Sequence, residues 1–360
     1  MARASASLVP HAGLSLTSTL MRHQDILVIG GSGFIGGHVV AALAADGRRV
    51  TVPARRREDG KRLILLPTVD VVEADVTDRA TLQRLVAGKD AVINLVGILH
   101  GDGKAFDAAH VGLPKKIVAA CRNARVLRLL HMSALGAASG GPSMYLRSKA
   151  AGEAVIEMAA EVATTDPGTV GGPHGTPRGA LLATTVFRPS VVFGPDDSFM
   201  NLFATMQRWL PIVPLAGAKT LFQPVSVRDV AAAFVAALDD DESFSRTYEL
   251  TGPRVYALEE LVQIAGAYRI GGNGRPRPIL RLPDALGRLQ AAFLEFAPGP
   301  TLMSRDNFDS MRVANIATGR YPGLSELGIV PTPLEPDVAA YVGGKGRRSH
   351  LDQLRHWAHH

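Results

Sequence analysis

The segment QDILVIGGSGFIGGHVVAALAADGRRVTVPARR, from Gln24 to Arg56, carries glycines at a spacing of three between an apolar run and an alanine-rich run. The apolar run DILVIG is typical of a buried strand, and FIGGHVVAALAAD is typical of a helix that ends at Gly47. RRVTVPAR then predicts a second strand. This order of strand, glycine turn, helix and strand decides the fold class, because parallel strands need such a crossover helix.

The same alternation continues from residue 26 to residue 192. Further strands are predicted at VDVVEADV, DAVINLVGIL, RVLRLLHMSALG and LLATTVFRPSVVFG, with helices between them. Near-continuous apolar strands separated by helices indicate a parallel sheet covered on both faces. We therefore predict an α/β fold, a doubly wound parallel sheet of the Rossmann type, with a smaller and mostly helical C-terminal lobe.

The chain divides into four predicted regions. Residues 1–22 are Ser-rich and are predicted to lie outside the fold, as a disordered extension, a targeting segment or a non-native start upstream of Met21. Residues 23–194 form the sheet domain, 195–335 the smaller lobe woven onto it, and 336–360 a basic tail. Residues 164–180 are rich in Gly, Pro and Thr and predict a surface loop.

Composition limits the class of protein and its partners. Hydrophobic residues make up 46% of the 360 residues, and the single cysteine, Cys121, fits a reducing compartment. The net charge is +6, but the two basic clusters, Arg55–Arg57 and Lys345–Arg348, are not interleaved with aromatics, so no nucleic-acid partner is predicted. We expect a cytoplasmic protein, with a peripheral place at the inner face of the membrane as the alternative. His356, His359 and His360 have no acidic or cysteine neighbours, so no metal site is predicted.

The glycines fit a turn that binds a dinucleotide. Gly30 permits the tight turn, Gly33 leaves the backbone open to a pyrophosphate, and Gly36 lets the helix approach the sheet. Gly31 shares the assignment because Gly31, Gly33 and Gly36 satisfy an alternative frame. The N–H groups of the first helical turn would face the phosphates. The predicted cofactor-binding residues of this turn are Gly30, Gly31, Ser32, Gly33, Phe34, Ile35 and Gly36.

The end of the second strand bears on which cofactor binds. A protein that binds NAD(H) usually has an acidic residue there to bind the ribose diol, whereas an arginine at this place binds the 2′-phosphate of NADP(H). The sequence PARRR offers Arg55 and Arg56, with no acidic residue before Glu58. We therefore predict NADP(H) as the cofactor, with NAD(H) as the alternative.

HMSALG and SMYLRSKAAGE resemble the active-site segments of the short-chain dehydrogenase/reductase superfamily, in its extended or atypical branch. The resemblance implies that Ser133, Tyr145 and Lys149 are catalytic, and that Tyr145 and Lys149 also bind the cofactor. The spacing of four residues places Tyr145 and Lys149 on one helix face. We expect the charge of Lys149 to lower the pKa of Tyr145, and Ser133 to orient a substrate carbonyl.

Other segments extend the resemblance. It implies that Asp75 and Val76, after the third strand, touch the adenine. Val96 and Gly97, in the NLVG segment, would line the cofactor path, and Pro189 would lie near the nicotinamide. Many catalytic members carry an asparagine near the position of His110, which here is either a proton relay or a packed side chain.

A narrower resemblance is carried by YLRSKAAGE, RPSVVFGPDDSFMNLFATM and SRDNFDSM. Together they are similar to the alpha-subcomplex subunit nine family of respiratory complex I, an NADPH-binding accessory subunit family with bacterial relatives. The resemblance implies tightly held NADPH, a contact with a respiratory complex or a membrane surface, and a role that is often structural. Related proteins are associated with ubiquinone biosynthesis.

Three functions follow. The first is an NADP(H)-dependent oxidoreductase linked to quinone or respiratory-chain metabolism, which acts on a hydrophobic or quinone-like small molecule. The second is a non-catalytic accessory or assembly subunit stabilised by NADPH, in complex I or a ubiquinone-synthesis complex. The third is a nucleotide-sugar epimerase or dehydratase, which the arginines after the second strand disfavour because such enzymes usually use NAD.

Overall fold

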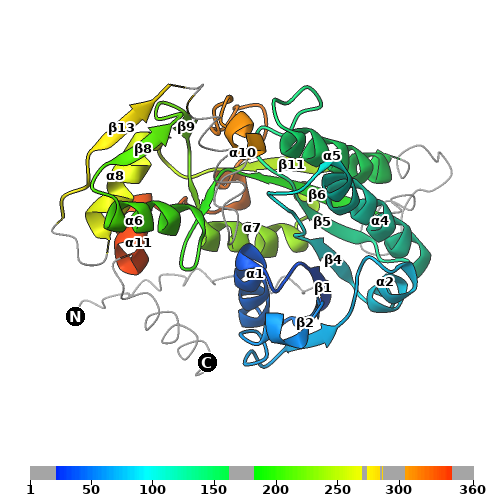
Figure 1. The fold of residues 1–360 in the computed structure, drawn as a ribbon. Coiled ribbons are helices and arrows are strands. Elements are labelled where there is room, and N and C mark those ends of the chain that lie inside the picture. Colours follow the sequence, from blue (N-terminus) through cyan, green and yellow to red (C-terminus); the bar gives the residue numbers. More distant parts are fainter. Residues whose placement is uncertain (1–21, 162–181, 270–273, 284–285, 287–304, 343–360) are drawn as a thin grey trace, which may run out of the picture.

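The computed structural model describes residues 22–161, 182–269, 274–283, 286 and 305–342 (Figure 1). Nearly all of the predicted N-terminal extension, the loop predicted at 164–180 and the tail beyond residue 342 lie outside the described residues.

A seven-stranded parallel sheet forms the centre of the molecule, in the order β11-β6-β5-β4-β1-β2-β3. The predicted doubly wound α/β fold is confirmed. The strand order changes direction between β1 and β4, and ligands of such sheets bind outside the carboxyl ends of the strands at this point. The strands are β1 (Asp25–Ile29), β2 (Arg49–Ala54), β3 (Val69–Glu73), β4 (Ala91–Asn94), β5 (Arg128–Met132), β6 (Ala183–Pro189) and β11 (Arg246–Leu250).

Helices cover both faces of the sheet because its strands are apolar on both faces (Figure 1). In β1, Ile26 and Val28 join the core beneath α1 (Phe34–Ala45) and α7 (Val227–Leu238). Leu27 and Ile29 point to the opposite core, which is covered by three other helices. These are α2 (Arg79–Val86), α4 (Leu113–Ala124) and α5 (Met144–Glu161).

The smaller lobe has its own apolar core, built around Phe203, Leu261 and Val338. The chain does not remain in this lobe after residue 195, because α7 and β11 return to the sheet. The lobe and its connections contain α6 (Phe199–Trp209), α8 (Leu258–Tyr268), α10 (Arg305–Ser310), α11 (Leu334–Val342), β7 (Val192–Phe193), β8 (Val213–Ala216), β9 (Leu221–Phe222), β10 (Val225–Ser226), β12 (Tyr256–Ala257) and β13 (Ile279–Leu282). No helix among the described residues is long and apolar enough to cross a membrane.

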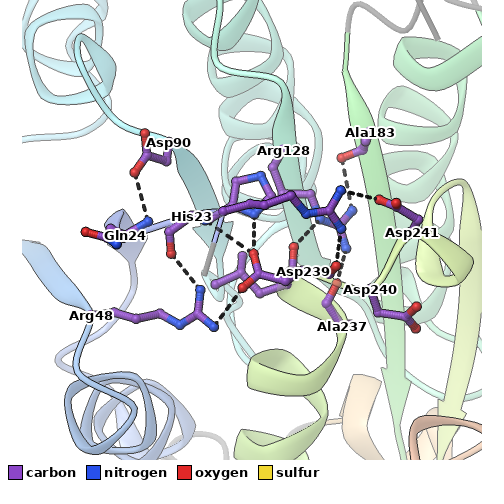
Figure 2. Close-up of polar contacts among 12 residues, drawn as sticks. His23, Gln24, Arg48, Asp90, Arg128, Ala183, Ala237, Asp239, Asp240 and Asp241 are labelled. Atoms are coloured by element: carbon purple, nitrogen blue, oxygen red, sulfur yellow. Dashed lines mark hydrogen bonds and ion pairs between the residues drawn. The ribbon is translucent and has the colours of Figure 1, made fainter. Parts of the chain in front are cut away.

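Buried charged side chains join the elements at the amino-terminal ends of the sheet strands (Figure 2). Asp239, just after α7, accepts hydrogen bonds from His23 (2.6 Å) and Arg48 (3.0 Å). Arg128 is completely buried and donates to the carbonyls of Ala237 (2.6 Å) and Leu238 (3.1 Å), which lie in the last turn of α7 and have no partner within the helix. Burial lowers the pKa of Arg128 to about 9, against the attraction of nearby aspartates. These residues stabilise the edge opposite to the one where ligands of open sheets bind.

Candidate active site

The glycine turn after β1 brings the start of α1 against the carboxyl end of the sheet. Gly30 has a φ of +85°, and a Cβ there would lie 3.1 Å from the backbone nitrogen of Val96. A Cβ on Gly36 would lie 2.2 Å from the carbonyl oxygen of Gly30, so α1 packs directly on the turn. A Cβ on Gly31 would meet Val52 of β2 at 2.9 Å. Gly30 and Gly31, the first glycines of the two alternative frames, therefore have separate roles. Gly30 adopts the positive φ of the turn, and Gly31 leaves room for the side chain of Val52.

The first turn of α1 leaves backbone donors for a ligand. Gly33 is the N-cap of α1, and no side chain caps this end of the helix. The N–H groups of Phe34, Ile35 and Gly36 belong to the first helical turn, which lacks partners within the helix. Because no acidic residue occupies this turn, the positive end of the helix dipole is available to an anion. The residues present therefore fit the pyrophosphate of a dinucleotide.

Arg55 and Arg56 follow the last residue of β2 and are exposed. The Arg56 guanidinium is 3.6 Å from the carboxylate of Asp59, whereas no carboxylate pairs with Arg55 among the described residues. A hollow of about 290 Å³ opens nearby, between the first turns of α1 and the segment 58–66. The ion pair of Arg62 with Asp196 (2.7 Å) lies at its wall and links this segment to the smaller lobe.

The ends of β3 and β4 carry further predicted residues. The exposed carboxylate of Asp75 accepts hydrogen bonds from the Thr77 hydroxyl (2.7 Å) and the Thr77 N–H (2.8 Å), which lower its pKa. Val76 is half-buried and packs against the core. The half-buried Val96 packs on the same core, and a Cβ at Gly97 would lie 3.0 Å from the Nζ of Lys149. A glycine at position 97 therefore permits the close approach of Lys149.

Ser133 and the ammonium of Lys149 both lie near the carboxyl end of β5. Ser133 is buried, and its hydroxyl has no hydrogen-bond partner among the described residues. The Nζ of Lys149 donates to the carbonyls of Met132 (3.1 Å) and Val96 (3.5 Å), next to Ser133 and Gly97 in the chain. The buried Pro189 ends β6, and its carbonyl accepts the N–H of Leu135 (2.9 Å). Ser133 thus follows the end of β5, Pro189 ends β6, and the ammonium of Lys149 is bonded to the backbone at the ends of β4 and β5.

Tyr145 lies in the first turn of α5 and is half-buried against the rings of His110 (centroids 5.7 Å apart) and Phe106 (6.4 Å). Burial raises the pKa of Tyr145 to about 12, the opposite direction from the predicted downward shift. Burial also lowers the pKa of Lys149 to about 8, against the attraction of Glu153. The pKa of Tyr145 is raised, and not lowered as predicted, because burial is the cause that acts on its hydroxyl. The ammonium of Lys149, which was expected to lower this pKa, instead donates to backbone carbonyls.

His110 sits in a π-helical turn, Ala108–Gly112, ahead of α4. Its Nε2 accepts the N–H of Ile98 (3.0 Å), so its Nδ1 carries the proton and donates to the Ser148 hydroxyl (2.8 Å). Burial and the charge of Lys149 lower the pKa of His110 to about 3. His110 is therefore a neutral, packed side chain that fixes the loop after β4 to α5.

Two further contacts support the site and were not predicted from the sequence. Asp306 of α10 accepts the N–H groups of Met144 (2.6 Å) and Tyr145 (3.0 Å), and so caps the helix that carries Tyr145. Glu153, one turn after Lys149, pairs in a bidentate manner with Arg188 of β6 (2.6 and 2.8 Å). The signal for this pair was present, because an arginine within an apolar strand requires a partner.

Similarity to known proteins agrees with this geometry. The family described as NAD dependent epimerase/dehydratase matches residues 26–250, more than half of the chain. The chain belongs to this family. It is the extended branch of the short-chain dehydrogenase/reductase superfamily, whose members bind a nicotinamide dinucleotide.

Curated relatives include a respiratory subunit and a reductase. The chain is 32% identical over 320 residues to the mouse "NADH dehydrogenase [ubiquinone] 1 alpha subcomplex subunit 9, mitochondrial", covering 86% of this chain and 77% of that protein. It is 29% identical over 268 residues to a "Ceramide reductase" of Caulobacter vibrioides, covering 72% and 74% of the two chains.

The fold is shared with solved epimerase structures. UDP-glucose 4-epimerase from Thermotoga maritima superposes with a TM-score of 0.65 at 18% identity, over 91% of this chain and 100% of that one. At this identity the likeness shows the fold alone. Among the described residues, no group of three or more His, Cys, Asp or Glu side chains could hold a metal ion.

Proposed function

We propose that this member of the epimerase/dehydratase family is an NADP(H)-dependent oxidoreductase that reduces a carbonyl group of a hydrophobic or quinone-like substrate. The observation that carries the proposal is the Ser133 hydroxyl, which is buried without a partner beside the backbone that holds Lys149. Leaving a buried hydroxyl without a hydrogen bond costs about 1–3 kcal/mol. A substrate carbonyl oxygen would satisfy this donor.

The protonation states favour reduction. With a pKa of about 12, Tyr145 keeps its proton at neutral pH and can donate it to the oxygen of the substrate carbonyl. Ser133 would hold the same oxygen by a hydrogen bond. Lys149, with a pKa of about 8, is mostly charged at neutral pH and stabilises the negative charge that develops on that oxygen or on Tyr145.

The cofactor contributes the electrons. When bound, NADPH supplies the hydride that reduces the carbonyl carbon to an alcohol. The pyrophosphate would be held by the N–H groups of Phe34, Ile35 and Gly36, and the 2′-phosphate by Arg55 and Arg56. The names of the two curated relatives support the substrate class, because one names ubiquinone and the other names ceramide, and both molecules are hydrophobic.

The test is NADPH oxidation with a short-chain ubiquinone and with a long-chain aliphatic ketone. We expect Tyr145→Phe to lower turnover by about 10²- to 10⁴-fold, the usual contribution of a general acid, while the NADPH dissociation constant stays within twofold. Tyr268→Phe, at an exposed position of α8, is the matched control and should keep full turnover. Turnover that survives in Tyr145→Phe would contradict the proposed role of Tyr145.

A second function is supported by the similarity to the mouse respiratory subunit. In this function NADPH is a structural ligand and the protein is an accessory or assembly subunit. A ligand that binds only the folded protein stabilises it by about 2.7 kcal/mol at a hundredfold excess over its dissociation constant. An NADPH-induced rise in melting temperature that Tyr145→Phe retains, with no turnover of either substrate, favours this second function.

A further inference from the structure

Helix α10 and the residues after it join the smaller lobe to the helix that carries Tyr145. We call residues 305–315 the α10 segment. Phe308 is buried and packs on the ends of β8 and β13 in the smaller lobe. The Thr220 hydroxyl donates to the carbonyl of Met311 (3.0 Å), the residue after α10, and so holds it to the loop before β9. Figure 1 shows α10 between these strands and α5.

The other contacts of the α10 segment hold the start of α5. The two carboxylate oxygens of Asp306 accept separate hydrogen bonds, one from the N–H of Met144 (2.6 Å) and one from the N–H of Tyr145 (3.0 Å). The hydroxyl of Ser310 lies 2.8 Å from that of Ser143, the residue just before α5. The α10 segment therefore contacts α5 through polar groups and the smaller lobe through a buried ring.

The first turn of α5 takes a partner from outside the helix. A capping residue usually satisfies the N–H of the second or third helical position with its own side chain. The Ser143 hydroxyl does this for the N–H of Leu146 (3.1 Å), the third residue of α5. The N–H groups of the first two residues, Met144 and Tyr145, have no partner within the helix and are bonded to Asp306 instead. The backbone position of Tyr145 thus depends on a residue that lies 161 positions later in the chain.

This backbone contact matters for the hydroxyl of Tyr145. The ring packs against those of His110 (centroids 5.7 Å apart) and Phe106 (6.4 Å). These contacts constrain the plane of the ring, whereas the position of the hydroxyl also follows from the backbone at the first turn of α5. A general acid must lie within hydrogen-bond reach of the oxygen that it protonates, and a displacement of about 1 Å can lower a rate about 100-fold.

We propose that Asp306 is a positioning residue for Tyr145, through which the smaller lobe sets the place of the general acid. The proposal rests on the proposed function, in which Tyr145 donates a proton to the substrate oxygen. Asp306 acts through the backbone and does not touch the reacting atoms. Because Phe308 anchors the same segment on the smaller lobe, we expect the packing of that lobe to affect turnover through Asp306.

The test compares Asp306→Ala with a matched control. The control is Asp78→Ala, which also removes a carboxylate that accepts a first-turn N–H, that of Thr81 in α2 (2.8 Å). Loss of a cap should lower the melting temperature of both variants by about 2–4 °C. At saturating NADPH, with whichever of the two test substrates the wild type reduces, kcat should fall about 100-fold in Asp306→Ala and stay within about twofold in Asp78→Ala. The NADPH dissociation constant should stay within about twofold in both variants.

Two further variants separate positioning from a general loss of stability. Asp306→Asn keeps one acceptor oxygen, so its kcat should lie between those of the wild type and Asp306→Ala. Phe308→Leu loosens the contact of α10 with the smaller lobe and should lower kcat severalfold. Because both residues act through Tyr145, the double variant of Asp306→Ala with Phe308→Leu should be no slower than Asp306→Ala alone. Fully additive losses would overturn the link to the smaller lobe.

Hydrogen exchange tests the contact without turnover. In peptides that span residues 142–148, the N–H groups of Met144 and Tyr145 should exchange at least about tenfold faster in Asp306→Ala, because both lose their acceptor. Unchanged exchange, or a kcat of Asp306→Ala that equals that of the wild type, would overturn the proposal. A wild type that reduces neither substrate would contradict the proposed function, and faster exchange would then still support Asp306 as the residue that holds Tyr145.

Discussion

The ion pair beneath the active site gives a sharp stability prediction. The Glu153 side chain is only 4% exposed and that of Arg188 14%, and they share two hydrogen bonds. Burial alone lowers the pKa of Arg188, but the hydrogen bonds and charge of Glu153 outweigh it and raise the pKa overall. Glu153→Gln would therefore leave Arg188 charged and buried without an anion.

Breaking such a pair costs about 3–5 kcal/mol, and we expect a value near 3 because Arg188 keeps some solvent and a stacking contact with Tyr321 (4.7 Å). At about 2 °C per kcal/mol for a chain of this size, the melting temperature should fall by about 6 °C. The control is Glu242→Gln, which removes an exposed partner of Arg246 (3.1 Å) and should change stability by less than about 0.5 kcal/mol.

The same substitution should also alter the site. Glu153 holds the pKa of Lys149 up, so its loss should move that pKa below about 8. The ammonium of Lys149 would then be lost at lower pH, and the alkaline limb of the NADPH oxidation profile should shift to lower pH. Differential scanning calorimetry and a pH series of turnover measure the two effects. A Glu153→Gln protein with the same melting temperature as the Glu242→Gln control would refute the reasoning about the buried pair.

Two further predictions concern acid stability and the glycine turn. Burial, with the charge of Lys149, holds the pKa of His131 at about 3, far below its unfolded value of about 6.5. Between these two pH values His131 is protonated in the unfolded chain but not in the folded protein. The free energy of unfolding therefore falls as pH drops through this range. His131→Asn should remove about 1.4 kcal/mol per pH unit from that slope in urea titrations between about pH 6 and pH 4, and an unchanged slope would contradict the assignment. Gly36→Ala should destabilise the protein by about 1–3 kcal/mol and abolish dinucleotide binding, because the new Cβ would lie 2.2 Å from a backbone oxygen. The control is Gly37→Ala, whose Cβ would meet nothing within 4 Å, so its effect on stability should be neutral or stabilising. Equal binding by the two glycine variants would argue against direct packing of α1 on the turn.

The sequence was sufficient to predict six of the seven strands of the sheet. Apolar runs at a regular spacing predicted β1 to β6, because buried parallel strands leave few polar positions. β11 was not predicted as the seventh strand, since RTYEL is short and its place beside β6 depends on tertiary packing. The return of α7 to the sheet was missed for the same reason.

The candidate site was predictable as a set of positions but not in its electrostatics. Spacing alone places Tyr145 and Lys149 on one helix face, yet the raised pKa of Tyr145 depends on burial contributed by distant segments. The cap that Asp306 provides to α5 joins residues separated by about 160 positions in the chain, and no local pattern encodes such a contact. The role of His110 likewise required the position of Ile98.

The central claim is that NADPH binds to the glycine turn and that Arg55 and Arg56 recognise its 2′-phosphate. Fluorescence titration of the purified protein with NADPH and with NADH tests it most directly, with Arg57→Gln as a matched control for Arg55→Gln and Arg56→Gln. Charge-assisted hydrogen bonds are worth about 1.5–3 kcal/mol each, so NADPH should bind at least about tenfold more tightly than NADH. The double substitution of Arg55 and Arg56 should erase that preference while NADH affinity stays the same. Equal affinity for the two cofactors in the wild type, or a preference that survives the double substitution, would contradict the account.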